Sequence, residues 1–232
     1  MRVLAPCFIF LVLFFSSSKG QDQYDLTLSG SLTTSSKLFR QPDDFDDLVS
    51  GEFLPINNIL GFGIDVRRKF EEHHLQAGLS IEYLTKTESG NNHSPEGNSI
   101  RIKDGFTVIP IELTGYFAIP FSSERVEIYM GGGGGTYLGR RNYQYGNVRA
   151  RSVQTGVGFG IHVLSGVQYE LKRRLALRIE MKFRNVQFRT GNSFPDPTSI
   201  YYSDGTALPS GPFPSRISID GMDMTLGLVF HF

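Results

Sequence analysis

The sequence predicts an all-β protein: an antiparallel, up-and-down β-barrel of about eight strands. The final stretch, from Gly221 to Phe232, places a large apolar side chain at every second position, as a strand with one apolar face does. About seven earlier segments alternate in the same way. The connections between these segments are long and short in turn, which is typical of a meander of hairpins.

The amino terminus predicts an export signal. Arg2 precedes an apolar run over residues 3–15, and the small residues Ser18 and Gly20 follow it. This run is shorter than the roughly 20 residues of a spanning helix, which weakens the alternative of a membrane anchor. We therefore predict a cleaved signal peptide over residues 1–20 and a barrel over residues 21–232. Cys7 lies in the signal, so the mature chain would contain no cysteine and no disulfide.

Eight strands are predicted from the alternation, taken in chain order. They cover residues 24–33, 58–67, 74–85, 106–118, 126–138, 153–169, 175–184 and the stretch from residue 217 to the end. Strands of about 10–12 residues suffice to cross a bilayer when tilted. Near Asn185 the pattern of the seventh strand slips, which indicates a bulge or the exit of the strand from the sheet.

Four long and three short connections join these strands. The long ones cover residues 35–55, 88–104, 139–152 and 190–215, and the short ones cover residues 68–72, 120–124 and 170–174. Long extracellular loops and short periplasmic turns are typical of barrels in bacterial outer membranes. Both chain ends fall on the side of the short turns.

The apolar face could line the inside, as in a lipocalin, or face lipid. Opposite charges alternate with the apolar residues and could neutralise one another inside a narrow lumen; Asp223 with Lys182 or Arg184 is the predicted example. Tyr and Phe gather near the strand ends like two interfacial girdles. The membrane arrangement is therefore favoured. The predicted lumen charges are Asp65, Arg67, Glu82, Glu112, Glu127, Arg178, Glu180, Lys182, Arg184 and Asp223.

The closing strand resembles that of bacterial outer-membrane barrels, in which a terminal aromatic residue follows apolar residues at alternate positions. Across the mature chain the pattern resembles small eight-stranded barrels of the OmpA transmembrane-domain and OmpX type and the PorT-like barrels of Bacteroidetes. The resemblance implies an outer-membrane location and recognition by the barrel-assembly machinery. The residues that carry this signal here are Leu226, Leu228, Phe230 and Phe232.

Several candidate sites are better explained by structure than by chemistry. The glycine run over residues 131–135 lacks the Lys and Ser/Thr of a phosphate loop. Gly156, Gly158 and Gly160 would leave room for bulky neighbours such as Tyr129 or Tyr137. The acidic stretch over residues 43–47 lacks the spacing of a calcium loop, so no metal or cofactor is predicted.

The function expected first is that of a non-enzymatic outer-membrane barrel with a charge-plugged lumen and surface loops for interaction. A narrow pore or transporter for small or hydrophobic solutes is the alternative. A lipid A-modifying enzyme is a third, but His93 and His162 stand in no recognisable pattern with a serine and an acid. The loop with Arg140, Arg141, Arg149 and Arg151 could meet lipopolysaccharide phosphates or a surface protein. Because basic and acidic residues balance, no nucleic-acid partner is predicted.

Overall fold

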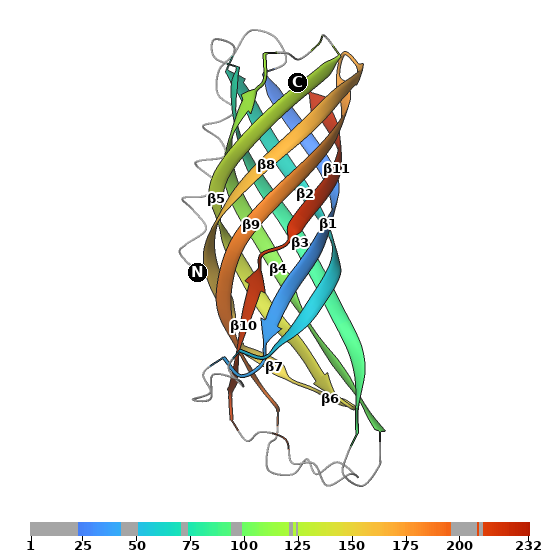
Figure 1. Cartoon of the computed structure of the whole chain (residues 1–232), viewed down its shortest axis with the longest axis vertical. Coiled ribbons are helices and arrows are strands. Elements are labelled where there is room, and N and C mark those ends of the chain that lie inside the picture. Colours follow the sequence, from blue (N-terminus) through green and yellow to red (C-terminus); the bar gives the residue numbers. More distant parts are fainter. Residues whose placement is uncertain are drawn as a thin grey trace.

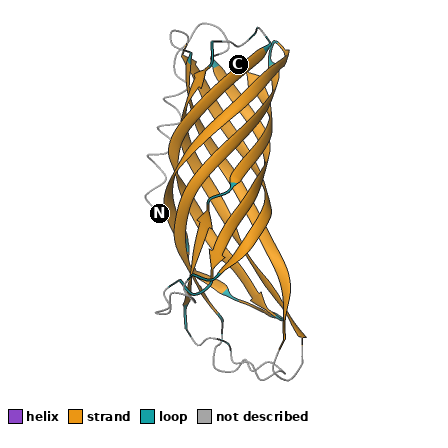
Figure 2. Cartoon of the chain, viewed as in Figure 1, coloured by secondary structure: helices purple, strands orange, loops and turns teal. Residues whose placement is uncertain are grey.

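The computed structural model of the chain describes residues 23–42, 51–70, 74–93, 99–120, 123, 125–195, 208 and 211–232. The predicted signal peptide with Cys7 and the acidic stretch over residues 43–47 lie outside these residues. Strands and loops make up the described part (Figure 2), and none of it forms a helix long and apolar enough to cross a membrane.

The strands differ widely in length. They are β1 (Tyr24–Phe39), β2 (Phe53–Phe70), β3 (Leu75–His93), β4 (Ser99–Ala118), β5 (Val126–Tyr145), β6 (Val148–Arg149), β7 (Arg151–Gln154), β8 (Gly156–Lys172), β9 (Leu175–Ser193), β10 (Phe213–Ile219) and β11 (Met222–His231).

Strand β1 closes the sheet into a barrel, because it pairs with β2 on one side and with β10 and β11 on the other. β10 and β11 are two halves of one wall strand, since their register with β9 continues unchanged from Ile219↔Val186 to Met222↔Phe183. β6 and β7 are short additions to β5 and β9. The wall therefore has eight antiparallel strands (Figure 1), and the predicted up-and-down barrel is confirmed.

The two ends of the barrel differ. Tyr24 and Phe232 meet at the end that carries the short turns, uppermost in Figure 1, which we call the turn end. There the backbone N–H of each residue donates to the carbonyl of the other at 3.0 Å, and the two rings stack with centroids 6.3 Å apart. The opposite end, where the long loops are predicted, is the loop end.

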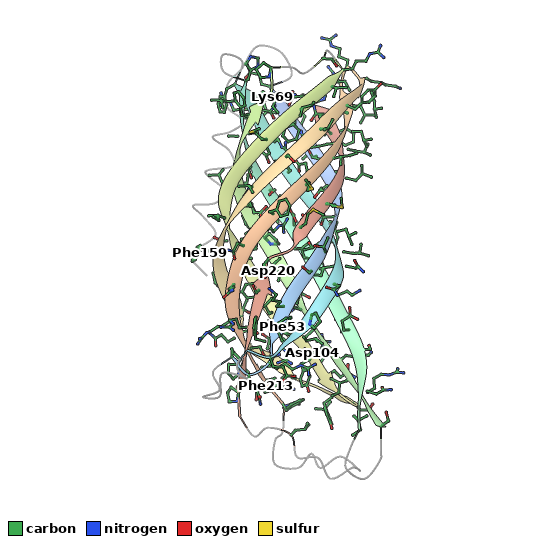
Figure 3. All side chains as sticks on the ribbon, in the orientation of Figure 1. Phe53, Lys69, Asp104, Phe159, Phe213 and Asp220 are labelled. Carbon is green, nitrogen blue, oxygen red and sulfur yellow. The ribbon has the colours of Figure 1, made fainter. Side chains whose placement is uncertain are left out.

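Exposed apolar side chains form a belt on the outside of the barrel, and Phe159 of this belt is labelled in Figure 3. Phe159 and Ile161 on β8 are 78% and 72% exposed. Apolar surface of this extent is unfavourable in water, whereas a barrel with an apolar outside and a polar inside suits a bilayer. The belt includes Leu28, Leu60, Phe62, Ile64, Ile81, Leu113, Met130, Ile179, Phe183, Leu226, Leu228 and Phe230.

Beyond the belt the chemistry of the two faces is exchanged. On β9 the inward side chains pass from Arg184 to Val186 and Phe188, while the outward ones become Asn185 and Gln187. Burial alternates without interruption along this stretch. The predicted bulge is therefore wrong, and the register of β9 with β11 and β10 is unchanged across Asn185. The predicted exit holds on one side only: the β8–β9 ladder ends at Ile161↔Asn185, while β9 stays in the sheet through β10. Here the polarity of the surroundings of β9 changes from lipid outside to water outside.

Consequently, much of the sequence that predicts long loops lies in strands. Residues 35–39, 88–93, 99–104 and 139–145 extend β1, β3, β4 and β5 toward the loop end. In β1 and β2 the pattern is also hidden by a shift of phase. The buried positions move from Thr33 to Ser36 in β1 and from Ile56 to Ile59 in β2, beside Asn58 with its left-handed φ of 54°.

An apolar core fills the barrel inside this extension. Its buried side chains are Leu38, Ile56, Ile59, Leu84, Phe106, Val108, Tyr137, Val186, Phe188, Ile217 and Ile219. The molecule thus has two levels: a membrane-type barrel with a polar interior near the turn end, and a barrel with an apolar interior near the loop end.

Candidate functional site

The charged lumen is the most unusual feature of the turn-end level. Its residues are the inward positions of the wall strands, and four cations there are almost completely buried: Arg67, Arg178, Lys182 and Arg184, at 1%, 2%, 5% and 3% exposure. Buried charges are stable only when they are paired and hydrogen-bonded.

The part of the network nearer the loop end is built around two cations of β9. Lys182 Nζ donates to Glu82 on β3 at 2.8 Å and to Glu112 on β4 at 2.7 Å. Arg184 Nη2 donates to the other oxygen of Glu82 at 2.6 Å and to Asp223 on β11 at 2.9 Å. These contacts connect four wall strands across the lumen.

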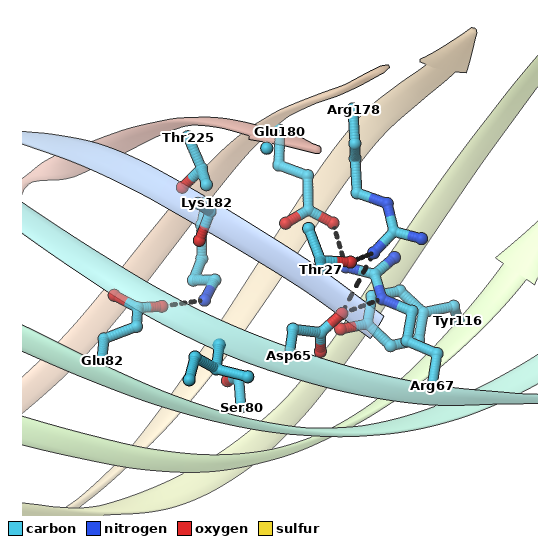
Figure 4. A pocket seen from close by; sticks show the side chains of 13 residues that line it. Thr27, Asp65, Arg67, Ser80, Glu82, Tyr116, Arg178, Glu180, Lys182 and Thr225 are labelled. Carbon is cyan, nitrogen blue, oxygen red and sulfur yellow. Dashed lines mark hydrogen bonds and ion pairs between the residues drawn. The ribbon is translucent and has the colours of Figure 1, made fainter. Parts of the chain in front are cut away.

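The part nearer the turn end is built around two arginines. Arg67 on β2 donates to Asp65 at 2.6 Å and to Glu180 on β9 at 2.5 Å. Arg178 donates to Asp65 at 3.0 Å (Figure 4) and to Asp25 on β1 at 3.3 Å. The Arg67 guanidinium also lies 3.7 Å from the ring centroid of Tyr116, close enough for a cation–π interaction.

A histidine continues the network to the turn end. His231 Nδ1 lies 2.6 Å from Asp25, and His231 Nε2 lies 3.1 Å from Glu170. Lys69 Nζ approaches the other oxygen of Asp25 at 3.2 Å. The carboxylate of Asp25 therefore joins β1 to β2, β9 and β11 at the barrel seam.

The structure brings nine of the ten predicted lumen charges into this network. Of the two predicted partners of Asp223, Arg184 makes the contact and Lys182 does not. The tenth residue, Glu127, lies apart and accepts a hydrogen bond from Gln76 at 2.8 Å.

Sequence reasoning missed several members of the network. Asp25 and His231 occupy polar positions of alternating strands, which is the signal that identifies the other charges. Tyr129 and Tyr137 are also missed; their hydroxyls donate to Glu180 and Glu112. Alternation places both tyrosines on the inner face, but it does not show that their hydroxyls bind the carboxylates.

The glycine run of β5 makes room for the network. Gly133 lies between Thr114 and His162 on the two neighbouring strands, and the Thr114 hydroxyl and His162 Nε2 meet across it at 2.8 Å. A Cβ on Gly135 would lie 2.9 Å from Cγ of Glu112. Gly156 and Gly158, predicted to accommodate tyrosines, instead face Phe188 and Val186, while Gly160 faces Tyr137 and Val186.

The lumen leaves almost no free space at this level. A cavity of about 20 Å³ remains beside Thr27, Ser80 and Lys182 (Figure 4). One water needs about 10–15 Å³ of such space, so the cavity has room for a single water rather than for a solute. The apolar core closes the lumen a second time toward the loop end.

His162 has the neighbours of a hydrolytic triad but no access. Its Nε2 contacts the Thr114 hydroxyl, and its Nδ1 lies 3.8 Å from Glu112. His162 and Thr114 are both 2% exposed and Glu112 is fully buried. A general base must reach a substrate as well as a nucleophile, and this group is enclosed between the charge network and the apolar core.

The predicted arginine and tyrosine loop divides into a buried and an exposed part. Arg141 points inward and forms two hydrogen bonds to Asp104, at 2.8 and 2.6 Å, and one to Ser215 at 2.6 Å. Tyr143, two residues after Arg141 on β5, packs against Phe194 and Phe213, and burial raises the pKa of the Tyr143 hydroxyl. Arg140, Arg149 and Arg151 are exposed. In the described part of the chain, no group of three or more His, Cys, Asp or Glu residues is placed to hold a metal.

Fold and lumen together define an eight-stranded β-barrel of the membrane-spanning type. No family model matches the chain, and no curated protein matches it in sequence. It is similar in fold to Neisserial surface protein A, with 14% identity over 92% of this chain and 100% of the other, and a TM-score of 0.47. It is also similar to the attachment invasion locus protein Ail of Yersinia pestis (12% identity, 91% and 99% covered, TM-score 0.43). A third similar structure is the outer membrane protease OmpT of Escherichia coli (13% identity, 93% and 99% covered, TM-score 0.46).

Proposed function

We propose that the chain is a closed, non-enzymatic outer-membrane barrel that holds its loop end above the membrane for contact with external partners. The observation that carries the proposal is the double closure of the lumen, by a charge network and then by an apolar core. An eight-stranded barrel is just wide enough for its side chains to fill. A plugged lumen is unsuited to the alternative role of a pore or transporter.

The proposal includes a route to the membrane. The predicted signal over residues 1–20 would direct export, and Leu226, Leu228, Phe230 and Phe232 would be read by the barrel-assembly machinery. These four side chains lie on the outer face of β11 and its end, where another protein can reach them. This is the role that the resemblance to OmpA-, OmpX- and PorT-like barrels implies.

The loop end supplies the surface for external partners. Arg140, Arg149 and Arg151 are exposed there, and their guanidinium groups can pair with lipopolysaccharide phosphates or with acidic groups of a protein. The enclosed position of His162 supports a role without catalysis.

Orientation can be tested because the proposed mature chain has no cysteine. We would introduce Arg140→Cys at the loop end and Lys172→Cys at the turn end, both at exposed positions. On intact cells, a membrane-impermeant maleimide should label the first variant and label the second only after permeabilisation. The reverse pattern would overturn the proposed orientation.

Closure can be tested in planar lipid bilayers. The refolded chain should insert and produce no discrete conductance steps, whereas regular steps would favour the pore. Insertion itself is measured by heat-modifiability, since a closed barrel migrates faster on a gel when it is not boiled.

A further inference from the structure

The barrel wall separates between β2 and β3 near the loop end. The ladder between these strands ends at Leu60↔Thr85, although β2 begins at Phe53 and β3 continues to His93 (Figure 1). Over residues 86–93, β3 pairs with β4, and no strand among the described residues pairs with its other side. Within the described ranges the extension therefore has a free edge.

The backbone groups that point to this edge follow from the ladder. The His74 carbonyl accepts the N–H of Ala118 on β4, and β3 keeps one register with β4 up to His93↔Ser99. Successive residues of a strand direct their N–H and C=O to opposite neighbours. The even-numbered residues of β3 thus bond to β4, while Thr87, Ser89 and Asn91 present their backbone groups to the free edge.

This edge carries the charged pair Lys86 and Glu88, whose side chains lie 3.5 Å apart, but it lacks the two protective features of the facing stretch of β2. The facing stretch of β2 contains Pro55 and the left-handed Asn58, and proline and irregular backbone both hinder the addition of a strand. Residues 86–91 contain no proline and no break in register. Thr87, Ser89 and Asn91 are exposed, so an incoming strand meets no bulky side chain.

A second copy of the chain does not fit this edge. Two copies in one membrane have β3 running in the same direction. A two-fold axis along the membrane normal would then set each N–H opposite the same N–H of the other copy. The tilt of the strands would also make the two edges cross. An extended segment of another protein meets neither of these two obstacles.

The charges beside the edge indicate the chemistry of that segment. Lys103 and Arg101 on β4 pair with Ser89 and Asn91, and both cations are exposed. Cross-strand neighbours share a face of the sheet. The short side chains of Ser89 and Asn91 leave both cations free to reach over toward an added strand. Acidic residues at alternate positions of that strand would face them.

We propose that the edge formed by Thr87, Ser89 and Asn91 binds an extended acidic peptide segment, which adds to β3 as an antiparallel strand. This recognition mode combines main-chain hydrogen bonds with side-chain contacts at alternate positions. The proposal rests on the proposed function, because the loop end must lie outside the cell for such a partner to reach it.

The edge can be observed directly by amide hydrogen exchange of the full refolded chain in lipid nanodiscs. The probe is a capped peptide of about seven residues that alternates Thr and Glu. The amides of Thr87, Ser89 and Asn91 should exchange rapidly in the free protein and slow at least about tenfold with the peptide, whereas Gly90, bonded to β4, should be slow throughout. Protection of all four amides without peptide would overturn the proposal.

Variants separate backbone pairing from charge. Ser89→Pro removes one edge N–H and should weaken binding of the Thr/Glu peptide about tenfold, while Ser89→Ala keeps the N–H and should bind like the native chain. Arg101→Glu with Lys103→Glu should shift the preference to a peptide that alternates Thr and Lys. Equal binding by the proline and alanine variants, or an unchanged preference in the double variant, would contradict the inference.

Heat-modifiability and bilayer insertion of each variant distinguish the two proposals. A chain that inserts, is labelled at the loop end and yet binds neither peptide would overturn the edge site alone. A chain that fails to insert or is labelled from the wrong side would overturn the proposed function and the edge site with it.

Discussion

Arg184 Nη2 lies 2.9 Å from Oδ2 of Asp223, although the residue opposite Asp223 in the β9–β11 ladder is Lys182. Arg184, two residues after Lys182 on β9, reaches diagonally across the ladder to Asp223. Lys182 donates to Glu82 and Glu112 instead. Each cation therefore bridges two acids on different strands. The contacts hold the wall strands together across the lumen.

The first prediction concerns the contribution of Arg184 to stability. In Arg184→Met, Glu82 and Asp223 lose a buried partner, and the free energy of unfolding should fall by about 3–5 kcal/mol. The measurement is the urea midpoint of the barrel refolded in detergent. Arg140→Met, at an exposed position on β5, is the control and should change stability by less than about 0.5 kcal/mol.

A double variant tests whether the loss is due to unpaired charge. Adding Asp223→Asn to Arg184→Met removes the charge of one of the two acids that lost Arg184 as a partner, and should restore part of the stability. Strictly additive losses would mean that the pair contributes through packing rather than through charge.

The second prediction concerns the glycine run of β5. In Gly133→Ala the new Cβ would overlap the Leu113 carbonyl oxygen and lie 3.0 Å from Cα of Thr114. Overpacking of this kind costs about 1–3 kcal/mol. Gly115→Ala places its Cβ 3.9 Å from the nearest atom, on the lipid side, and should be close to neutral in the same urea titration. Equal effects of the two variants would show that Gly133 is not constrained by its neighbours.

Much of the fold can be predicted from the sequence because alternation survives in every wall strand, and β11 shows it most clearly. The charged residues of the lumen can be predicted for the same reason. The partner of each charge cannot, since alternation gives the face of a side chain but not the direction in which Arg184 and Lys182 extend across the lumen.

The strand extensions fail to be predicted for a different reason. Phe188 and Val186 point inward as Arg184 does, but apolar residues change from the outer to the inner face beyond Phe183. If each strand is expected to keep one apolar face throughout, the position where apolar residues change face is taken for the end of the strand. The free edge of β3 escapes prediction as well, because Thr87, Ser89 and Asn91 have the composition of a loop.

The third prediction locates the boundary of the membrane on β9. Ile179 lies in the apolar belt and Gln187 lies beyond it, and both point outward. Ile179→Lys should destabilise the barrel in bilayers by about 2–4 kcal/mol, whereas Gln187→Lys should cost at most about 1 kcal/mol. The measurement is reversible guanidinium unfolding from lipid vesicles. Equal costs would place both positions in the same environment and contradict the two-level barrel.

The fourth prediction separates the role of Phe232 in folding from its role in assembly. Phe232 stacks on Tyr24 and completes the seam between β11 and β1, so its deletion removes two backbone hydrogen bonds of 3.0 Å. Each such bond contributes about 0.5–1.5 kcal/mol. The refolded barrel should therefore be weakened yet still form and still be heat-modifiable in detergent.

Assembly of the same deletion variant in cells should fail to a much greater extent if Phe232 is also read by the assembly machinery. Tyr24→Ala is the matched control, because it removes the same stacking contact and leaves the carboxyl-terminal pattern intact. The proportion of heat-modifiable protein in the membrane fraction is compared for the two variants. Equal losses in cells would mean that Phe232 acts through the seam alone. A loss confined to the deletion would identify the terminal aromatic residue as a recognition signal, separate from its contribution to barrel closure.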